Sequence, residues 1–262
     1  MSALNIVHLY ANSMSTYGDA GNVLCLAQRA RWRGYEVTVH QPDIGDPLPT
    51  DADLYFFGGG QDAAQVAVGA DLQGTKAERL LADTAAGVPL LAICGGYQLL
   101  GSHFLPFEAE SIPGIGLFPV ETHASGYRMI GNLVIKANPI LDLPGDGFIV
   151  GFENHGGRTW PTGQFQPLGS VVSGFGNNGK DGSEGCIARN ALGCYLHGSV
   201  LPKNPHLADW LLLRALQRHH LLEILKPLDD TLEWQTHNQL VERFRHTSQA
   251  LPTIPQSRRG ER

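Results

Sequence analysis

The chain has 262 residues, a net charge of −6 and a pI near 6.0, and 42% of its residues are hydrophobic. This length allows a full α/β domain with an additional segment, whereas the acidic balance and the lack of a basic stripe argue against nucleic-acid binding. There is neither a signal-peptide pattern nor a run of 18 apolar residues, so we expect no membrane span and a cytoplasmic location. The four cysteines have neither disulfide-scaffold density nor zinc-ligand spacing, so no metal site is expected.

Strands and helices alternate in the first part of the chain. The pattern predicts strands over 4–10, 35–40, 53–57 and 88–93 and helices over 23–33 and 63–86, the second with a break near 69–74. This alternation predicts an α/β fold with a mostly parallel sheet flanked by helices. In such sheets the functional residues gather at the carboxyl ends of the strands.

The second half has extra strands and then two helices. Strands are predicted over 116–122, 132–136, 148–152, 169–173 and 193–196, and helices over 205–220 and 232–245, which would pack in the core or against a partner. We expect one domain over 1–220, a helical extension over 221–250 and a disordered tail over 251–262.

Cys94 ends the predicted strand over 88–93 and is followed by two glycines and a helical segment. A strand-to-helix turn of this kind lifts a nucleophile out of the end of a sheet, and a helix N-terminus favours a thiolate. The alternative is a buried structural cysteine, which is the commoner role of this residue type.

A cysteine nucleophile needs a base and donors for an oxyanion. His197 follows an apolar strand and precedes a glycine, and His155 competes with it because it too precedes glycines. The glycine run 58–60 at a strand end and the N–H of Gly95 are candidate oxyanion donors. The alternative, a phosphate-binding loop, lacks the lysine and serine of such loops.

Three blocks together, 57–62, 93–98 and 195–198, resemble the class I glutamine amidotransferases of the cobyric-acid-synthase type, which have a flavodoxin-like fold. The segments 17–22 and 151–155 narrow the resemblance to the glutaminase subunits of lipid II isoglutaminyl synthases, which amidate D-glutamate in peptidoglycan precursors. It covers residues 4–220. The resemblance implies that Cys94 attacks the amide of L-glutamine, releasing ammonia, with His197 as the base.

The resemblance also assigns the remaining site residues. It implies that Gly60 and Gly95 hold the oxyanion and that Arg128 binds the α-carboxylate of glutamine, with Gln61 and Gln98 as further polar contacts. Many class I relatives have a glutamate two residues after the histidine, where this chain has Ser199. The motif therefore provides no carboxylate to orient His197. We expect Glu153 or a residue of another protein to serve, and we expect slow glutamine hydrolysis by the isolated chain.

Amidation of a carboxylate requires its activation, and this chain has no P-loop motif. The resemblance implies a heterodimer in which a Mur-ligase-like subunit binds ATP, Mg²⁺ and lipid II and receives the ammonia, so no cofactor is expected in this chain. Three alternatives stay open: a cobalamin-type amidotransferase, a cysteine hydrolase of the same superfamily, and a non-enzymatic subunit whose site has decayed.

Overall fold

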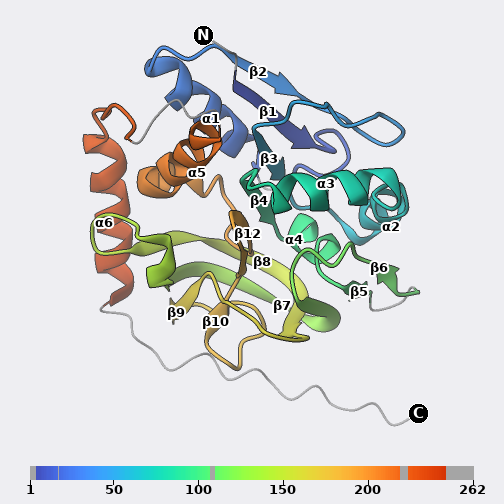
Figure 1. Cartoon of the computed structure of the whole chain (residues 1–262). Coiled ribbons are helices and arrows are strands. Elements are labelled where there is room, and N and C mark those ends of the chain that lie inside the picture. The colour runs from blue at the N-terminus through green and yellow to red at the C-terminus, as the bar shows by residue number, and fades with distance from the viewer. Residues whose placement is uncertain (1–3, 17, 107–109, 219–223, 246–262) are drawn as a thin grey trace.

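The computed structural model describes residues 4–16, 18–106, 110–218 and 224–245. These residues form a mostly parallel sheet and a mostly antiparallel sheet, with helices around them (Figure 1). The predicted α/β fold with a mostly parallel sheet is therefore confirmed. The predicted tail over 251–262 lies outside the described residues.

The first sheet has the strand order β11–β12–β4–β3–β1–β2 and is parallel except for β11 at one edge. Its strands are β1 (Leu4–Leu9), β2 (Val37–His40), β3 (Leu54–Phe57), β4 (Leu90–Ile93), β11 (Cys186–Ala188) and β12 (Ala191–Cys194). Every residue of β3, β4 and β12 is buried, as expected for apolar strands that are covered on both faces.

Helices cover both faces of this sheet, with α1 and α5 on one side and α2, α3 and α4 on the other (Figure 1). Their bounds are α1 (Ala20–Trp32), α2 (Asp62–Asp71), α3 (Thr75–Ala85), α4 (Gly95–Leu99) and α5 (Pro205–Gln217). The predicted break near 69–74 is confirmed: Gly74 separates α2 from α3 with a φ of +66°, which favours glycine. Helix α1 begins at Ala20 rather than at the predicted Val23.

The second sheet has the order β10–β9–β7–β5–β6, and β8 pairs with β7. Its strands are β5 (His103–Leu105), β6 (Ile112–Pro113), β7 (Val120–Ala137), β8 (Phe148–Pro161), β9 (Gly169–Ser173) and β10 (Ser183–Glu184). The prediction of separate strands over 116–122 and 132–136 is wrong, because β7 is one strand of 18 residues. The polar residues between the two apolar segments form a bulge and do not end the strand.

The two sheets meet at the end of β12, where Phe152 of β8 and His197 form an antiparallel bridge through their backbones. One hydrophobic core includes residues of both sheets. The short 3₁₀ helices η1 (Pro139–Leu141) and η2 (Leu201–Lys203) follow β7 and β12. The second sheet therefore closes over the carboxyl ends of the parallel strands.

Helix α6 (Thr231–Arg245) lies against β8, β9 and η2 (Figure 1). Its Val241 is buried in a small cluster with Val134, Phe148 and Val150. The part of the predicted extension that the structure describes therefore packs on the second sheet.

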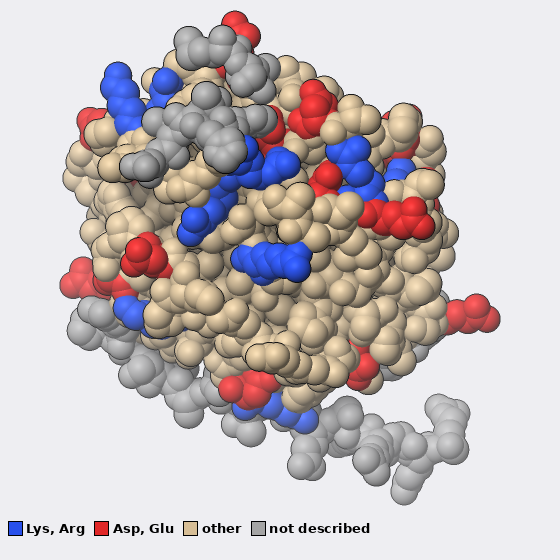
Figure 2. Space-filling model, viewed as in Figure 1, with Lys and Arg blue, Asp and Glu red and all other residues tan. Residues whose placement is uncertain are grey.

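Charged side chains are dispersed over the face in Figure 2, where Lys and Arg lie beside Asp and Glu and uncharged residues cover most of the surface. Among the described residues, no helix combines the length and apolar character needed to cross a bilayer.

Candidate active site

The site lies at the carboxyl ends of four neighbouring parallel strands. The chain leaves β1, β3, β4 and β12 there and supplies Asp19, the glycine run 58–60, Cys94 and His197 in turn. Because the strands are parallel, segments far apart in the sequence meet at this one edge.

Cys94 stands on a strained turn between β4 and α4. Its φ and ψ are 50° and −106°, a conformation that side-chain-bearing residues rarely adopt and that is typical of a nucleophile elbow. Its N–H donates to the carbonyl of Cys194 on the neighbouring strand, at 2.8 Å, and 8% of the residue is exposed. The turn therefore fixes the cysteine between the sheet and the first residues of α4.

Gly95 and Gly60 lie side by side next to Cys94. A Cβ placed on Gly95 would lie 3.0 Å from the backbone nitrogen of Gly60 and 2.4 Å from Nε2 of Gln65, so only glycine fits there. Gly95 begins α4, and the first N–H groups of a helix have no acceptor within the helix. Two backbone donors next to a nucleophile can stabilise a tetrahedral oxyanion.

His197 is fully buried beside Cys94, and its Nδ1 lies 3.2 Å from Oδ1 of Asp19. Burial alone lowers the pKa of His197, but the charge on Cys94 and the hydrogen bond to Asp19 outweigh it and raise the pKa to about 10. An imidazolium next to a thiolate is the state that activates a cysteine nucleophile.

Asp19 connects the histidine to the glycine run. The carboxylate is fully buried, and its second oxygen accepts the N–H of Gly59 at 2.7 Å. A Cβ on Gly59 would lie 2.7 Å from Cε1 of His197, so the glycine allows the ring to approach the loop. One carboxylate thus holds both the imidazole and the loop that ends in Gly60.

The expectation that the orienting carboxylate comes from Glu153 or from another protein is wrong. Glu153 accepts the N–H groups of Phe175 and Gly176, at 2.6 and 3.1 Å, and these bonds direct it away from His197. Ser199, which stands at the position of the usual glutamate, donates its hydroxyl to the carbonyl of Gly18. The reason for expecting slow hydrolysis by the isolated chain therefore does not hold.

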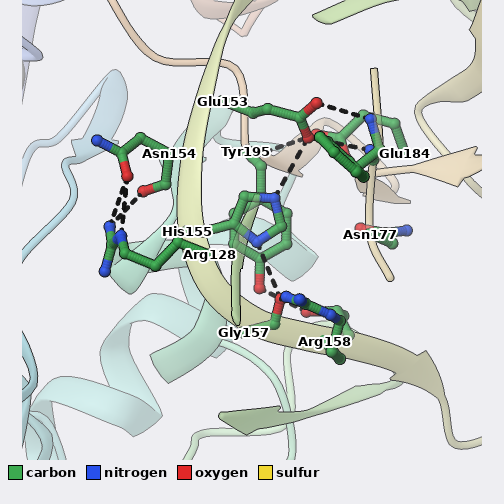
Figure 3. A network of polar contacts seen from close by, with 12 residues as sticks. Arg128, Glu153, Asn154, His155, Gly157, Arg158, Asn177, Glu184 and Tyr195 are labelled. Carbon is green, nitrogen blue, oxygen red and sulfur yellow. Dashed lines mark hydrogen bonds and ion pairs between the residues drawn. The ribbon is translucent and has the colours of Figure 1, made fainter. Parts of the chain in front are cut away.

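His155, the competing base, is part of a separate network (Figure 3). Its ring stacks on Tyr195 with centroids 3.6 Å apart, its Nδ1 lies 2.9 Å from the carbonyl of Gly157, and its Nε2 lies 3.4 Å from Glu153. Burial lowers the pKa of His155 despite the neighbouring Glu153. Both ring nitrogens are thus engaged within this network, whereas His197 interacts with Cys94.

A cavity of about 700 Å³ opens in front of Cys94. Five residues selected from the sequence line it, namely Gly60, Gln61, Cys94, Gln98 and Arg128. Its other walls come from β7 and β8 of the second sheet, including Ser125 and Asn154. Among the described residues, no group of three or more His, Cys, Asp or Glu side chains is arranged to hold a metal ion.

The polar side chains of the cavity differ in how tightly they are held. Gln98 is buried. Its Oε1 accepts a hydrogen bond from Nε2 of Gln65 at 2.7 Å, and its Nε2 donates to the Tyr195 hydroxyl at 3.1 Å. Arg128 is exposed, and its Nε and Nη2 bond the side chain and carbonyl of Asn154. Its Nη1 has no hydrogen-bond partner among the described residues and is free to bind a carboxylate. Gln61 lies at the start of α2, without a capping hydrogen bond from its side chain.

Asp19 was missed in the sequence because it lies 178 residues before the histidine that it contacts. The signal that could have identified it is its place in the loop after β1. Once β1 is the neighbour of β3, a buried acid in that loop must lie close to the glycine run.

Known proteins resemble the chain over most of its length. The CobB/CobQ-like glutamine amidotransferase domain matches residues 5–205. The lipid II isoglutaminyl synthase (glutamine-hydrolyzing) subunit GatD of Staphylococcus aureus is 36% identical over 244 residues, covering 93% of this chain and 97% of that protein. The protein of the same name from Streptococcus pneumoniae is 39% identical over 226 residues, covering 86% and 85%.

Among solved structures, PurLQS from Thermotoga maritima aligns with a TM-score of 0.53 over 83% of this chain and 97% of that chain. The two sequences are 17% identical, so this similarity concerns the fold alone. The domain match and the two relatives show that the chain belongs to the CobB/CobQ-like glutamine amidotransferase family.

Proposed function

We propose that this chain is a glutaminase subunit that hydrolyses L-glutamine to glutamate and ammonia. The observation that carries the proposal is the placement of Cys94 beside His197, at a cavity where Gly95 lies next to the backbone nitrogen of Gly60. Nucleophile, base and oxyanion donors are the three groups that acyl transfer from an amide requires.

In the first half of the reaction, Sγ of Cys94 attacks the side-chain amide carbon of glutamine. The proton of the thiol resides on His197, and Asp19 stabilises the resulting imidazolium. The N–H groups of Gly60 and Gly95 stabilise the oxyanion of the tetrahedral intermediate. The C–N bond breaks when the imidazolium protonates the leaving nitrogen, so ammonia departs and a glutamyl thioester remains on Cys94.

In the second half, His197 is neutral and takes a proton from water as the water attacks the thioester. The C–S bond breaks, glutamate leaves, and the proton held by His197 restores the starting pair with Cys94. Asp19 keeps Nδ1 protonated throughout, so that Nε2 is the nitrogen that exchanges protons.

Glutamine is held by the outer wall of the cavity. Arg128 binds the α-carboxylate through Nη1 and the edge that Asn154 leaves free, while Gln61 and Gln98 provide polar contacts. The buried hydrogen bonds from Gln65 and to Tyr195 fix the amide of Gln98 before the substrate arrives.

We propose further that the ammonia passes to a Mur-ligase-like subunit that binds ATP and Mg²⁺ and amidates the D-glutamate of lipid II to D-isoglutamine. This part is supported by the names of the two bacterial relatives and by the extent of the alignment, which covers nearly all of one of them. Because the acceptor is activated with ATP, the proposal places the heterodimer in the cytoplasm.

The test combines two assays on the chain co-purified with its partner. We expect ammonia and glutamate in equal amounts from L-glutamine, and amidated lipid II when ATP, Mg²⁺ and lipid II are also present. Amidation of a cobalamin precursor in place of lipid II would show that the proposed acceptor is wrong, while the proposed glutaminase activity would stand. Peptide hydrolysis without any ammonia from glutamine would overturn the whole proposal.

A further inference from the structure

The cavity wall that carries Arg128 is an irregular segment of β7. Ala124 pairs with Gly157 and Met129 pairs with His155, so residues 125–128 of β7 face the single residue Gly156 of β8. The extra residues form a large bulge, and bulges next to functional sites redirect side chains. Both Ser125 and Arg128 of this bulge line the cavity.

Arg158 of β8 is mostly buried and forms hydrogen bonds to the backbone at this bulge. Its Nη2 donates to the carbonyl of Tyr127 at 2.7 Å, and its Nη1 lies 3.1 Å from the carbonyl of Gly157 and 3.2 Å from that of Gly156. The guanidinium therefore joins the bulged residues of β7 to the residues of β8 that face them. Figure 3 shows Arg158 against Gly157 and Arg128 against Asn154.

The burial of Arg158 is unusual for a cation that bonds only backbone carbonyls. The residue is 8% exposed, burial lowers the pKa of its guanidinium, and no carboxylate of the described residues forms an ion pair with it. Removing a cation from water is costly unless its donors are satisfied. The guanidinium reaches carbonyls of two strands through two nitrogens in a fixed plane, a geometry that the single nitrogen of a lysine does not reproduce and that an aliphatic side chain lacks.

We propose that Arg158 is a positioning residue for glutamine binding, acting through Arg128. It fixes the carbonyl of Tyr127, the residue before Arg128, and so sets where the Arg128 guanidinium stands over the cavity. This inference rests on the proposed glutaminase function and adds a second arginine to the substrate site, one that does not itself touch the substrate.

The test is a double-mutant cycle of glutaminase kinetics with Arg128→Ala and Arg158→Met. Each single variant is expected to raise the KM for glutamine about tenfold, with kcat changed less than about threefold. Because Arg158 acts through Arg128, adding Arg158→Met to Arg128→Ala is expected to raise KM no further. Multiplicative effects in the double variant would instead place Arg158 in independent contact with substrate and overturn the inference.

The matched control is Arg33→Met. Arg33 also donates to two backbone carbonyls, those of Lys226 and Arg29, but it bonds Asp209 on the α5 side of the first sheet. We expect this variant to lose stability without a change in KM. If Arg158→Met does not fold, Arg158→Lys is used in the same cycle, because the single nitrogen of lysine cannot occupy the positions of both Nη1 and Nη2.

The outcomes separate this inference from the proposed function. A raised KM in Arg128→Ala with an unchanged KM in folded Arg158→Met or Arg158→Lys overturns the role of Arg158 alone. Absence of glutamine hydrolysis by the wild-type protein overturns the proposed function and this inference together.

Discussion

Replacing Asp19 by asparagine is the sharpest perturbation of the site, because the change removes a charge while nearly keeping the shape. The carboxylate uses one oxygen for Nδ1 of His197, at 3.2 Å, and the other for the N–H of Gly59, at 2.7 Å. Asparagine has a single oxygen, so its NH₂ group must face one of these two donors. Either the loop loses its hydrogen bond or His197 takes the wrong tautomer.

The expected loss in kcat is about 10²–10⁴-fold, by analogy with the loss of an orienting carboxylate in serine triads. This corresponds to about 3–5 kcal/mol in the activation free energy. The free energy of unfolding should fall by only about 1–3 kcal/mol, the cost of one buried unsatisfied donor. The protein should therefore remain folded while its rate of ammonia release collapses.

The assay is ammonia release at saturating glutamine, with Asp53→Asn as the matched control. Asp53 is also buried and also accepts a backbone N–H, that of Asn5 at 2.8 Å, but it precedes β3 at the opposite end of the strand. We expect the control to retain kcat. An unchanged kcat in folded Asp19→Asn, or an equal loss in Asp53→Asn, would refute the role of Asp19.

Cys94→Ala should abolish ammonia release without unfolding the protein, and residual glutaminase activity in a folded sample would remove Cys94 as the nucleophile. His197→Ala should lower kcat about 10²–10⁴-fold, whereas His155→Ala should lower it far less, and the reverse order would exchange their roles. Arg128→Ala should raise the KM for glutamine about tenfold with a smaller change in kcat, as expected for a lost carboxylate contact. The pKa of His197 is raised to about 10, so its contribution to the free energy of unfolding is fully present below pH 6.5 and is lost as the pH rises through 10. Without the charge of Asp19 this pKa falls, so the alkaline limb of kcat/KM in Asp19→Asn should move to lower pH.

The sequence predicted the parallel sheet because short apolar runs alternate with helical segments in the first part of the chain. The long hairpin of β7 and β8 was not predicted, because the polar segment 125–128 interrupts the alternation that marks a strand. In the structure, Arg158 bonds the carbonyl of Tyr127 in this segment and those of Gly156 and Gly157 on β8, a compensation that no local pattern reveals.

The site residues also divide into those that local patterns predict and those that depend on contacts between distant segments. Cys94, Gly60 and His197 follow strand ends, so their proximity could be inferred from the order of elements and the family resemblance. The contact between Asp19 and His197 could not, because it depends on which strands are neighbours in the sheet and on the ring packing against Gly59. A local search around His197 finds only Ser199, which bonds the backbone of Gly18.

Trapping the glutamyl thioester tests most directly whether Cys94 is the nucleophile that receives the glutamyl group of glutamine. The protein is mixed with L-glutamine, alone and with its co-purified partner, quenched in acid and digested for mass spectrometry. We expect a glutamyl group on the peptide that contains Cys94 in the wild-type protein and none on that peptide in Cys94→Ala. Ammonia release by the wild-type protein with the adduct on another residue, or no ammonia release in either sample, would contradict this role of Cys94.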